Sequence, residues 1–106
     1  MKIGVIIETN NPEKAWNGIR FANTALKQKH EVQLFLMGAG VEAESITDEK
    51  YNVRDQLHAF IDQQGTVLAC GTCIRSRNQK ESDACPISTM IDCLNMVKWA
   101  DKVITF

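Results

Sequence analysis

The segment Cys70-Gly71-Thr72-Cys73 contains the residues of this sequence whose types and spacing could do chemistry. The apolar run from Thr66 to Cys70 predicts a buried strand, and the residues that follow predict a turn of helix. Cys70 would then lie where the strand stops and the helix begins, facing free backbone N–H groups and the positive end of a helix dipole. Both favour the thiolate, which is the reactive form of cysteine. Cys70 is therefore the candidate nucleophile.

The residues that follow Cys70 extend this candidate site. Cys73 is one helical turn away, so a disulfide between the two thiols is geometrically conceivable, although Cys73 equally fits a helix residue that faces the core. Arg75 and Arg77 bring positive charge within about two helical turns of Cys70, where they would lower its pKa or, with Gly71, bind an anionic substrate. For each arginine alone, a solvated surface position is the alternative.

Two more cysteines follow in the chain. Cys85 precedes Pro86 in a polar stretch, residues 78–86, that reads as a mobile loop. An exposed thiol there could resolve a mixed disulfide or persulfide, and an incidental loop cysteine is the alternative. Cys93 falls on an apolar helical stripe that periodicity assigns to the core, together with Met90, Leu94 and Val97.

A metal site is the main rival use for the four cysteines. Their spacing, C-x2-C, C-x11-C and C-x7-C, formally allows a four-thiolate zinc or iron–sulfur centre. There is no second tight CxxC pair, however, and neither His30 nor His58 has ligand spacing with the cysteines. We therefore expect no metal, and the proposed thiol chemistry needs no organic cofactor.

Composition limits the classes of partner. The chain has 106 residues and a formal net charge of −1, which argues against electrostatic binding to nucleic acid or to an anionic membrane surface. The apolar run Ile3 to Ile7 is interrupted by Glu8 and is too short for a signal peptide or a membrane span. We expect a cytoplasmic protein whose thiols stay mostly reduced, and not one with two structural disulfides.

Apolar runs that alternate with amphipathic segments indicate strands alternating with helices. Strands are expected at residues 2–7, 32–37, 66–70 and 102–106. This alternation predicts βαβ units and a parallel sheet. Because ligands collect beyond the carboxyl ends of such strands, three segments should share one rim of the sheet: residues 8–11, 38–41 and 70–77.

These features together resemble the DsrE/DsrF-like family. The resemblance covers nearly the whole chain and lies in the opening apolar strand, in the Val-x-Leu-Phe-Leu strand that leads into Gly-x-Gly-Val (Val32 to Val41), and in a third strand that ends in cysteine. It implies one domain over residues 1–106 with a flavodoxin-like three-layer α/β fold, in which a four- or five-stranded, mainly parallel sheet carries helices on both faces.

The resemblance also implies a function. In the family, a cysteine at the end of the third strand accepts sulfur, which corresponds to Cys70, and basic residues after it loosely correspond to Arg75 and Arg77. Such proteins assemble into trimers, hexamers or hetero-oligomers, and active members carry sulfur as a cysteine persulfide between partner proteins. Cys73 departs from the pattern of the relay subunits, which suggests a dithiol cycle as an alternative.

We therefore predict a sulfur carrier, or a sulfurtransferase, in which Cys70 accepts a sulfane sulfur as a persulfide and relays it to a partner thiol. The expected partners are a sulfur donor protein, a sulfur acceptor protein and further copies of this chain in a trimer or hexamer. Two alternatives stay open at this point: a dithiol oxidoreductase that uses Cys70 and Cys73, and an oligomeric scaffold or binding protein whose cysteines are incidental. The sequence does not decide whether the protein is an enzyme.

Overall fold

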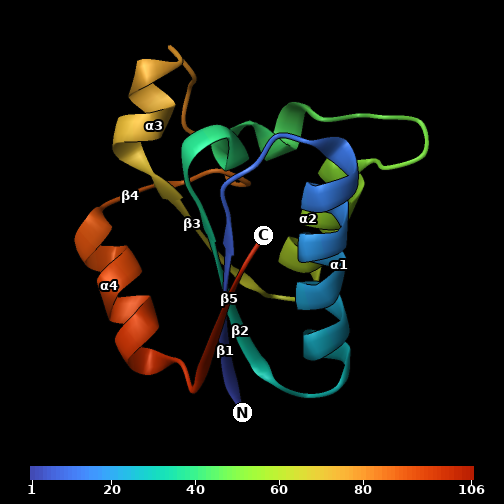
Figure 1. Cartoon of the computed structure of the whole chain (residues 1–106), viewed down its shortest axis with the longest axis vertical. Helices are drawn as coiled ribbons and strands as arrows, with labels where there is room; N and C mark the ends of the chain where they lie inside the picture. The colour runs from blue at the N-terminus through green and yellow to red at the C-terminus, as the bar shows by residue number, and fades with distance from the viewer.

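Five strands and five helical segments alternate along the chain in a computed structural model that describes all residues from 1 to 106 (Figure 1). In chain order they are β1 (Lys2–Ile7), α1 (Pro12–Lys27), β2 (Glu31–Leu36), the 3-10 helix η1 (Gly38–Ser45), α2 (Val53–Asp62), β3 (Thr66–Cys70), α3 (Gly71–Ser76), β4 (Ile87–Ser88), α4 (Met90–Trp99) and β5 (Lys102–Thr105). None of the helices is long and apolar enough to cross a bilayer.

The strands form one sheet in the order β4-β3-β2-β1-β5, and every neighbouring pair is parallel. Helices α1 and α2 cover one face of this sheet, and α3 and α4 lie on the other (Figure 1). The predicted flavodoxin-like three-layer fold is therefore confirmed. The short strand β4 was not predicted, because its two residues follow a polar stretch and carry no strand periodicity.

The central strands are apolar on both faces because both faces are covered. In β1 and β2 the side chains of Val5, Ile7, Leu34 and Leu36 are fully buried. This is the pattern expected for parallel strands between two helical layers. Their register places Val5 beside Leu34 on β2 and beside Ile104 on β5.

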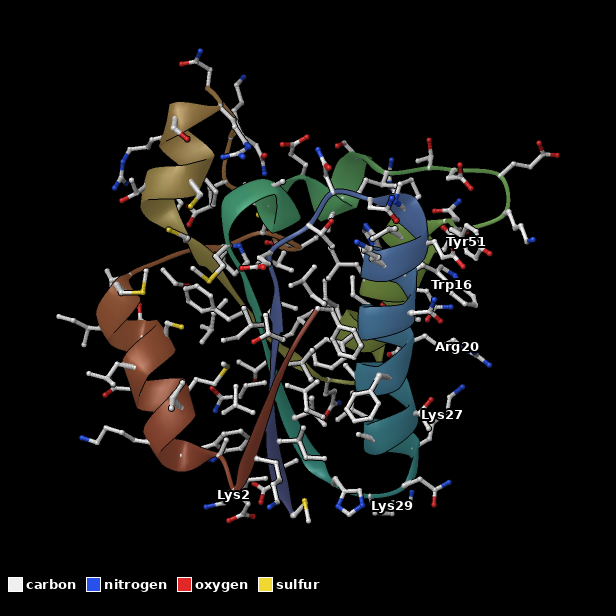
Figure 2. The ribbon with its side chains drawn as sticks, in the orientation of Figure 1. Lys2, Trp16, Arg20, Lys27, Lys29 and Tyr51 are labelled. Atoms are coloured by element: carbon white, nitrogen blue, oxygen red, sulfur yellow. The ribbon has the colours of Figure 1, made fainter.

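Helix α1 begins and packs as its sequence predicts. The Asn11 side chain caps its first turn and Pro12 occupies the first helical position. Trp16 is half-buried and meets Tyr51 edge-on, with the ring centroids 5.5 Å apart, while the Arg20 guanidinium lies 5.1 Å from the indole ring (Figure 2). These aromatic contacts attach α1 to the loop before α2.

Helix α4 corrects a prediction. Of the stripe assigned to the core, Cys93 is buried, but Met90, Leu94 and Val97 are exposed. The residue that joins Cys93 in the core is Met96, which reaches the sheet above Gly4, where a Cβ would lie 3.2 Å from its terminal methyl carbon. Because α4 has apolar residues on both its inner and its outer side, periodicity alone could not select the buried side.

Candidate functional site

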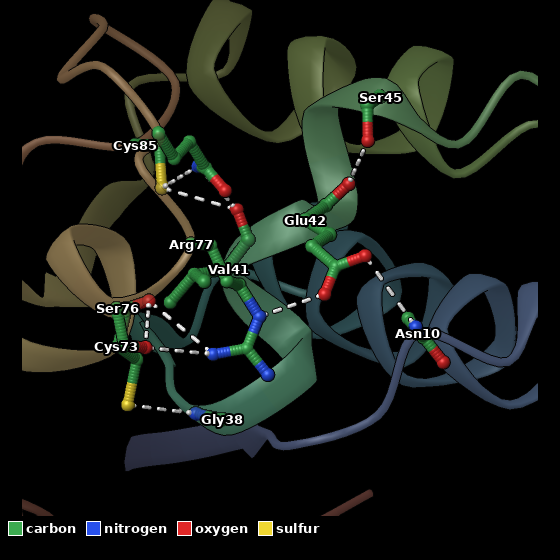
Figure 3. Close-up of polar contacts among 10 residues, drawn as sticks. Asn10, Gly38, Val41, Glu42, Ser45, Cys73, Ser76, Arg77 and Cys85 are labelled. Carbon is green, nitrogen blue, oxygen red and sulfur yellow. Dashed lines mark hydrogen bonds and ion pairs between the residues drawn. The ribbon is translucent and has the colours of Figure 1, made fainter.

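The three segments predicted to share one rim of the sheet lie in contact there. One of them, residues 38–41, is the start of η1, and the rest of η1 lies at the same rim. The backbone N–H of Gly38 donates to the sulfur of Cys73 at 3.2 Å, and the Asn10 side-chain amide donates to Glu42 at 3.4 Å (Figure 3). Gly40 lies against the end of β1 so closely that a Cβ there would overlap the carbonyl oxygen of Ile7. The glycines after β2 therefore serve a close backbone approach.

Cys70 is the last residue of β3 and the N-cap residue of α3, as predicted from the strand-to-helix transition. Burial acts to raise the pKa of its thiol. The neighbouring Cys73 thiol, the N–H groups of Cys73 and Thr72 at the start of α3 and the positive charge of Arg75 act against burial, although the Cys70 side chain makes no capping hydrogen bond. Together they hold the pKa of Cys70 below its usual value, so the thiolate is favoured at this position.

Cys73 has the opposite role in the pair. Its pKa is raised, first because its thiol lies beside the Cys70 sulfur and then because it is partly buried. The N–H of Gly38 opposes this shift without reversing it. Both cysteines are free thiols, and the opposite directions of their pKa shifts make Cys70 the more easily ionised of the two.

The Cys70 site lies at the rim but is largely covered. Cys70 is 6% exposed, and Cys93 of α4 lies near enough for a negative charge on Cys70 to raise the pKa of the Cys93 thiol, which burial already raises. Gly71 packs against β4, since a Cβ on it would lie 2.9 Å from Cγ2 of Ile87. The absence of a side chain at Gly71 allows β4 to close over the start of α3.

The two arginines predicted to serve the site are placed differently. Arg75 folds back over the first turn of α3, where its Nη1 lies 3.2 Å from the Cβ position of Gly71, and its charge lowers the pKa of Cys70. Arg77 is tied to η1: its Nε donates to Glu42 at 2.8 Å and its Nη1 donates to the carbonyl of Cys73 at 3.2 Å (Figure 3). Only Arg75 therefore acts electrostatically on Cys70.

Cys85 is not the exposed loop thiol that the sequence suggested. It is 1% exposed, and its S–H donates to the carbonyl oxygen of Val41 at 3.4 Å. Burial, reinforced by the nearby negative charge of Glu44, raises the pKa of Cys85 to about 11, against a weak opposing hydrogen bond from Gln79. Cys85 is therefore protonated and inaccessible, and it cannot resolve a persulfide as it stands.

The loop that carries Cys85 is fastened to η1 by side chains. The Gln79 amide donates to the Val41 carbonyl at 2.7 Å, and the Ser82 hydroxyl donates to Glu44 at 2.8 Å. Sequence reasoning read residues 78–86 as polar and mobile because their hydrogen-bond partners lie 38 positions earlier in the chain. A polar composition does not reveal such long-range partners.

The structure does not bring the four cysteines together. No group of three or more His, Cys, Asp or Glu side chains is placed to hold a metal ion. A surface hollow of about 750 Å³ does lie beside η1, and it includes Arg77 but neither Cys70 nor Cys73; its lining residues are Val41, Glu42, Glu44, Ser45, Arg54, Arg77, Gln79 and Lys80. The hollow is therefore separate from the thiol pair.

One functional group was missed entirely at the level of sequence, namely the N–H of Gly38. Its signal was the Gly-Ala-Gly turn at the end of β2, where Gly38 adopts a φ of 54°. This left-handed conformation suits glycine and turns the N–H toward Cys73. The turn thus contributes a sulfur-binding donor to the rim.

Two uncharacterized proteins and a solved structure resemble the chain over most of its length. The chain is 38% identical over 100 residues to an uncharacterized protein of Methanopyrus kandleri, covering 89% of this chain and 83% of that protein. It is 37% identical to an uncharacterized protein of Methanocaldococcus jannaschii, with full coverage of both. The crystal structure of the ychN protein from E. coli matches with a TM-score of 0.85, 28% identity and full coverage of both chains.

A second solved structure shares the fold alone. A protein of unknown function from Bacteroides thetaiotaomicron matches with a TM-score of 0.77 and 16% identity, covering 99% of this chain and 94% of the other. The model of the DsrE/DsrF-like family matches residues 1–106. With its parallel sheet, its cysteine at the end of β3 and these relatives, the chain belongs to the DsrE/DsrF-like family.

Proposed function

We propose that this protein carries sulfur as a persulfide on Cys70. The observation that supports this most strongly is the position of Cys70 between the end of β3 and the start of α3, where its surroundings lower its pKa while the pKa of Cys73 is raised. A thiol whose pKa is lowered is a ready nucleophile. Membership of the DsrE/DsrF-like family suggests sulfur relay in general terms, and the thiol pair gives that suggestion a specific residue.

The transfer consists of two thiol exchanges with no net oxidation. The Cys70 thiolate attacks the outer sulfur of a donor persulfide, R–S–SH. A new S–S bond forms on Cys70 while the donor S–S bond breaks and the donor leaves as a thiolate. An acceptor thiolate then attacks the outer sulfur of the Cys70 persulfide and regenerates the Cys70 thiolate. Both half-reactions need only the donor and acceptor thiols.

The residues around Cys70 have distinct roles in this proposal. The cation of Arg75 receives the anionic sulfur of the donor, whereas Gly71, which was predicted to bind substrate, is buried beneath β4. Arg77 was predicted to bind substrate with them, and its contacts with Glu42 and the Cys73 carbonyl suit it to holding α3 against η1. No residue of the site requires an organic cofactor or a metal for these steps.

The proposal also includes the setting in which the protein works. It requires a reducing compartment such as the cytoplasm, since Cys70 must begin as a free thiol. Its partners are a donor protein, an acceptor protein and further copies of this chain in a trimer or hexamer. The donor and acceptor are defined here only by the persulfide and the thiol that they present.

Intact mass after incubation with a persulfide donor tests the proposal. The reduced protein should gain one sulfur atom that dithiothreitol removes, and Cys70→Ser should gain none. Cys85→Ser is the matched control, because this thiol is buried and protonated and its loss should leave the gain unchanged. Loading that survives in Cys70→Ser, or that fails in the unsubstituted protein, would contradict the proposal.

A second candidate function is a dithiol cycle, which the effect of each thiol on the pKa of the other favours. After loading, a Cys73 thiolate would attack the inner sulfur of the Cys70 persulfide, forming a Cys70–Cys73 disulfide and releasing hydrosulfide. The protein would then lose two hydrogens relative to its reduced form and hydrogen sulfide would appear in solution. Cys73→Ser should retain the persulfide if this cycle operates, and a scaffold without thiol chemistry should show neither change.

A further inference from the structure

The surface hollow beside η1 has a charge arrangement that the proposed sulfur transfer does not use. Its volume of about 750 Å³ lies in the range of small-molecule sites, and Val41 is the one apolar residue of its lining. Because η1 follows β2 and α3 follows β3, the hollow lies at the rim formed by the carboxyl ends of parallel strands, where ligands commonly bind. Its polar lining suits a hydrophilic ligand.

Both carboxylates of the hollow are already engaged by the chain. Glu42 accepts a hydrogen bond from Nε of Arg77 at 2.8 Å, and this contact is the main cause of its lowered pKa (Figure 3). Glu44 accepts from the Ser82 hydroxyl at 2.8 Å and lies 3.2 Å from Nε2 of His58. The acidic side chains of the hollow therefore serve contacts within the chain, and they leave the character of the site to its cations.

Two cations that line the hollow have no partner in the chain. These are Arg54 of α2 and Lys80 of the loop between α3 and β4, and neither takes part in the ion pairs of the structure. With Arg77, the hollow holds three cations against two carboxylates, although the whole chain has a formal net charge of −1. An excess of unpaired positive charge in a concave site attracts anions.

Arg54 lies at a position where a helix disfavours a cation. It is the second residue of α2, where the partial positive charge of the helix N-terminus repels a guanidinium group. Asp55 in the same turn forms no ion pair with it. A residue that opposes the local preference of its helix without a compensating contact is typical of a functional site.

The backbone fixes both unpaired cations at the edge of the hollow. The N–H of Arg54 donates to the carbonyl of Ile46, directly after η1, at 3.0 Å. Lys80 lies between Gln79 and Ser82, whose side chains both donate to acceptors on η1. Because these attachment points are already ordered, an incoming anion has to order only the two side chains, which reduces the entropic cost of binding.

We propose that the hollow binds a small hydrophilic oxyanion with at least two anionic groups, a polyphosphate or a polycarboxylate. Arg54 and Lys80 come from separate segments, so two anionic groups are needed to engage both. A guanidinium fork suits the paired oxygens of either phosphate or carboxylate. Arg77 keeps its contact with Glu42 and adds positive charge to the wall. The inference goes beyond the proposed sulfur transfer, because neither Cys70 nor Cys73 lines the hollow.

Calorimetric titration at constant ionic strength tests the site with two probes, inorganic pyrophosphate and citrate. The unsubstituted protein should bind at least one of them saturably, and the two arms distinguish a phosphate ligand from a carboxylate ligand. Arg54→Gln and Lys80→Gln should each weaken that binding about tenfold, as expected for the loss of one charge-assisted contact. Lys98→Gln is the matched control, because Lys98 is an exposed cation on α4 outside the hollow and its loss should leave the affinity unchanged.

Orthophosphate and acetate, each with a single anionic group, should bind at least about tenfold more weakly than the corresponding probe. Far-UV circular dichroism establishes that each variant is folded. The inference is overturned if neither probe binds saturably, if Lys98→Gln loses as much affinity as Arg54→Gln, or if the single-group anions bind equally well.

The anion site and the sulfur transfer can be tested apart. Cys70→Ser should bind the probe as the unsubstituted protein does, because Cys70 does not line the hollow. A protein that binds the probe but takes up no sulfur from a persulfide donor contradicts the proposed function alone. A protein that takes up sulfur on Cys70 but binds neither pyrophosphate nor citrate contradicts this inference alone.

Discussion

Cys70 and Cys85 are both buried, at 6% and 1% exposed, yet the fold surrounds their sulfur atoms with opposite partners. Cys70 lies beside the backbone N–H groups at the start of α3 and the Cys73 thiol, and its pKa falls despite burial. Cys85 itself donates to a backbone carbonyl, and burial raises its pKa to about 11. The degree of burial therefore does not decide which thiol is reactive; the kind of group that faces the sulfur does.

Both environments depend on η1. Its first residue, Gly38, supplies the N–H that holds Cys73 beside Cys70, and Val41, three residues later, supplies the carbonyl that accepts from Cys85. The Gly38 N–H lowers the pKa of Cys73 without reversing its upward shift, and the Val41 carbonyl accepts from the protonated Cys85. One short 3-10 helix thus contacts both Cys73, the neighbour of the candidate nucleophile, and the inert Cys85.

The largest expected effect comes from displacing η1. Gly40→Ala should lower the free energy of unfolding by about 3 kcal/mol, because the new Cβ would overlap the carbonyl of Ile7 and push η1 off β1. Gly38→Ala is the control. Its new Cβ would make only an ordinary contact, and the strain of alanine at the positive φ of this position should lower the free energy of unfolding by about 1 kcal/mol. Unfolding in guanidinium chloride measures the loss of stability in both variants. Equal losses would show that close packing of Gly40 on β1 does not hold η1 in place.

The next effect is a contrast in reactivity within one protein. At neutral pH, Cys70 should react with iodoacetamide on the order of a hundredfold faster than Cys85, because each unit of pKa changes the thiolate fraction about tenfold. Peptide mapping by mass spectrometry reads both sites in one sample. The contrast should vanish in denaturant, and comparable rates in the folded protein would refute it.

The two thiols should also give stability opposite dependences on pH. Because folding raises the pKa of Cys85, its contribution is complete below the unfolded pKa of about 8.5 and is lost as pH rises toward 11. Between pH 8 and pH 10 the stability advantage of the protein over Cys85→Ala should shrink by about 2 kcal/mol.

Cys70 supplies the contrary case. Because folding lowers its pKa, its contribution is present above the unfolded pKa and is lost as pH falls through the folded one, so the advantage over Cys70→Ala should grow with pH in that interval. Unfolding under reducing conditions at several pH values measures both differences. Slopes of the same sign would contradict the assigned environments.

The smallest expected effect separates the two arginines. Arg75→Gln should move the pH–rate profile of Cys70 alkylation upward by a few tenths of a pH unit, about a two- to threefold slower reaction near neutrality, because it removes a partly screened charge. Arg77→Gln should leave that profile in place, since Arg77 is paired with Glu42. A larger shift in Arg77→Gln would reverse the assignment.

Much of the fold and the centre of the site could be predicted from local sequence. The bounds of β1 and β3, the cap of α1 at Asn11 and the position of Cys70 at the end of β3 agree with the structure. Each depends on residues that are neighbours in the chain: an apolar run, a capping side chain, a strand followed at once by a helix. Parallel pairing follows because short βαβ connections permit little else.

Contacts between distant residues decided the rest. Cys85 is buried because its partner Val41 lies 44 positions earlier, and Cys73 keeps its place because Gly38 donates to it across 35 positions. The inward side of α4 was chosen by the space above Gly4, which Met96 fills, and not by the apolar stripe through Leu94. Periodicity and capping act within a few residues, whereas the environment of a sulfur atom depends on whichever backbone groups the folded chain brings beside it.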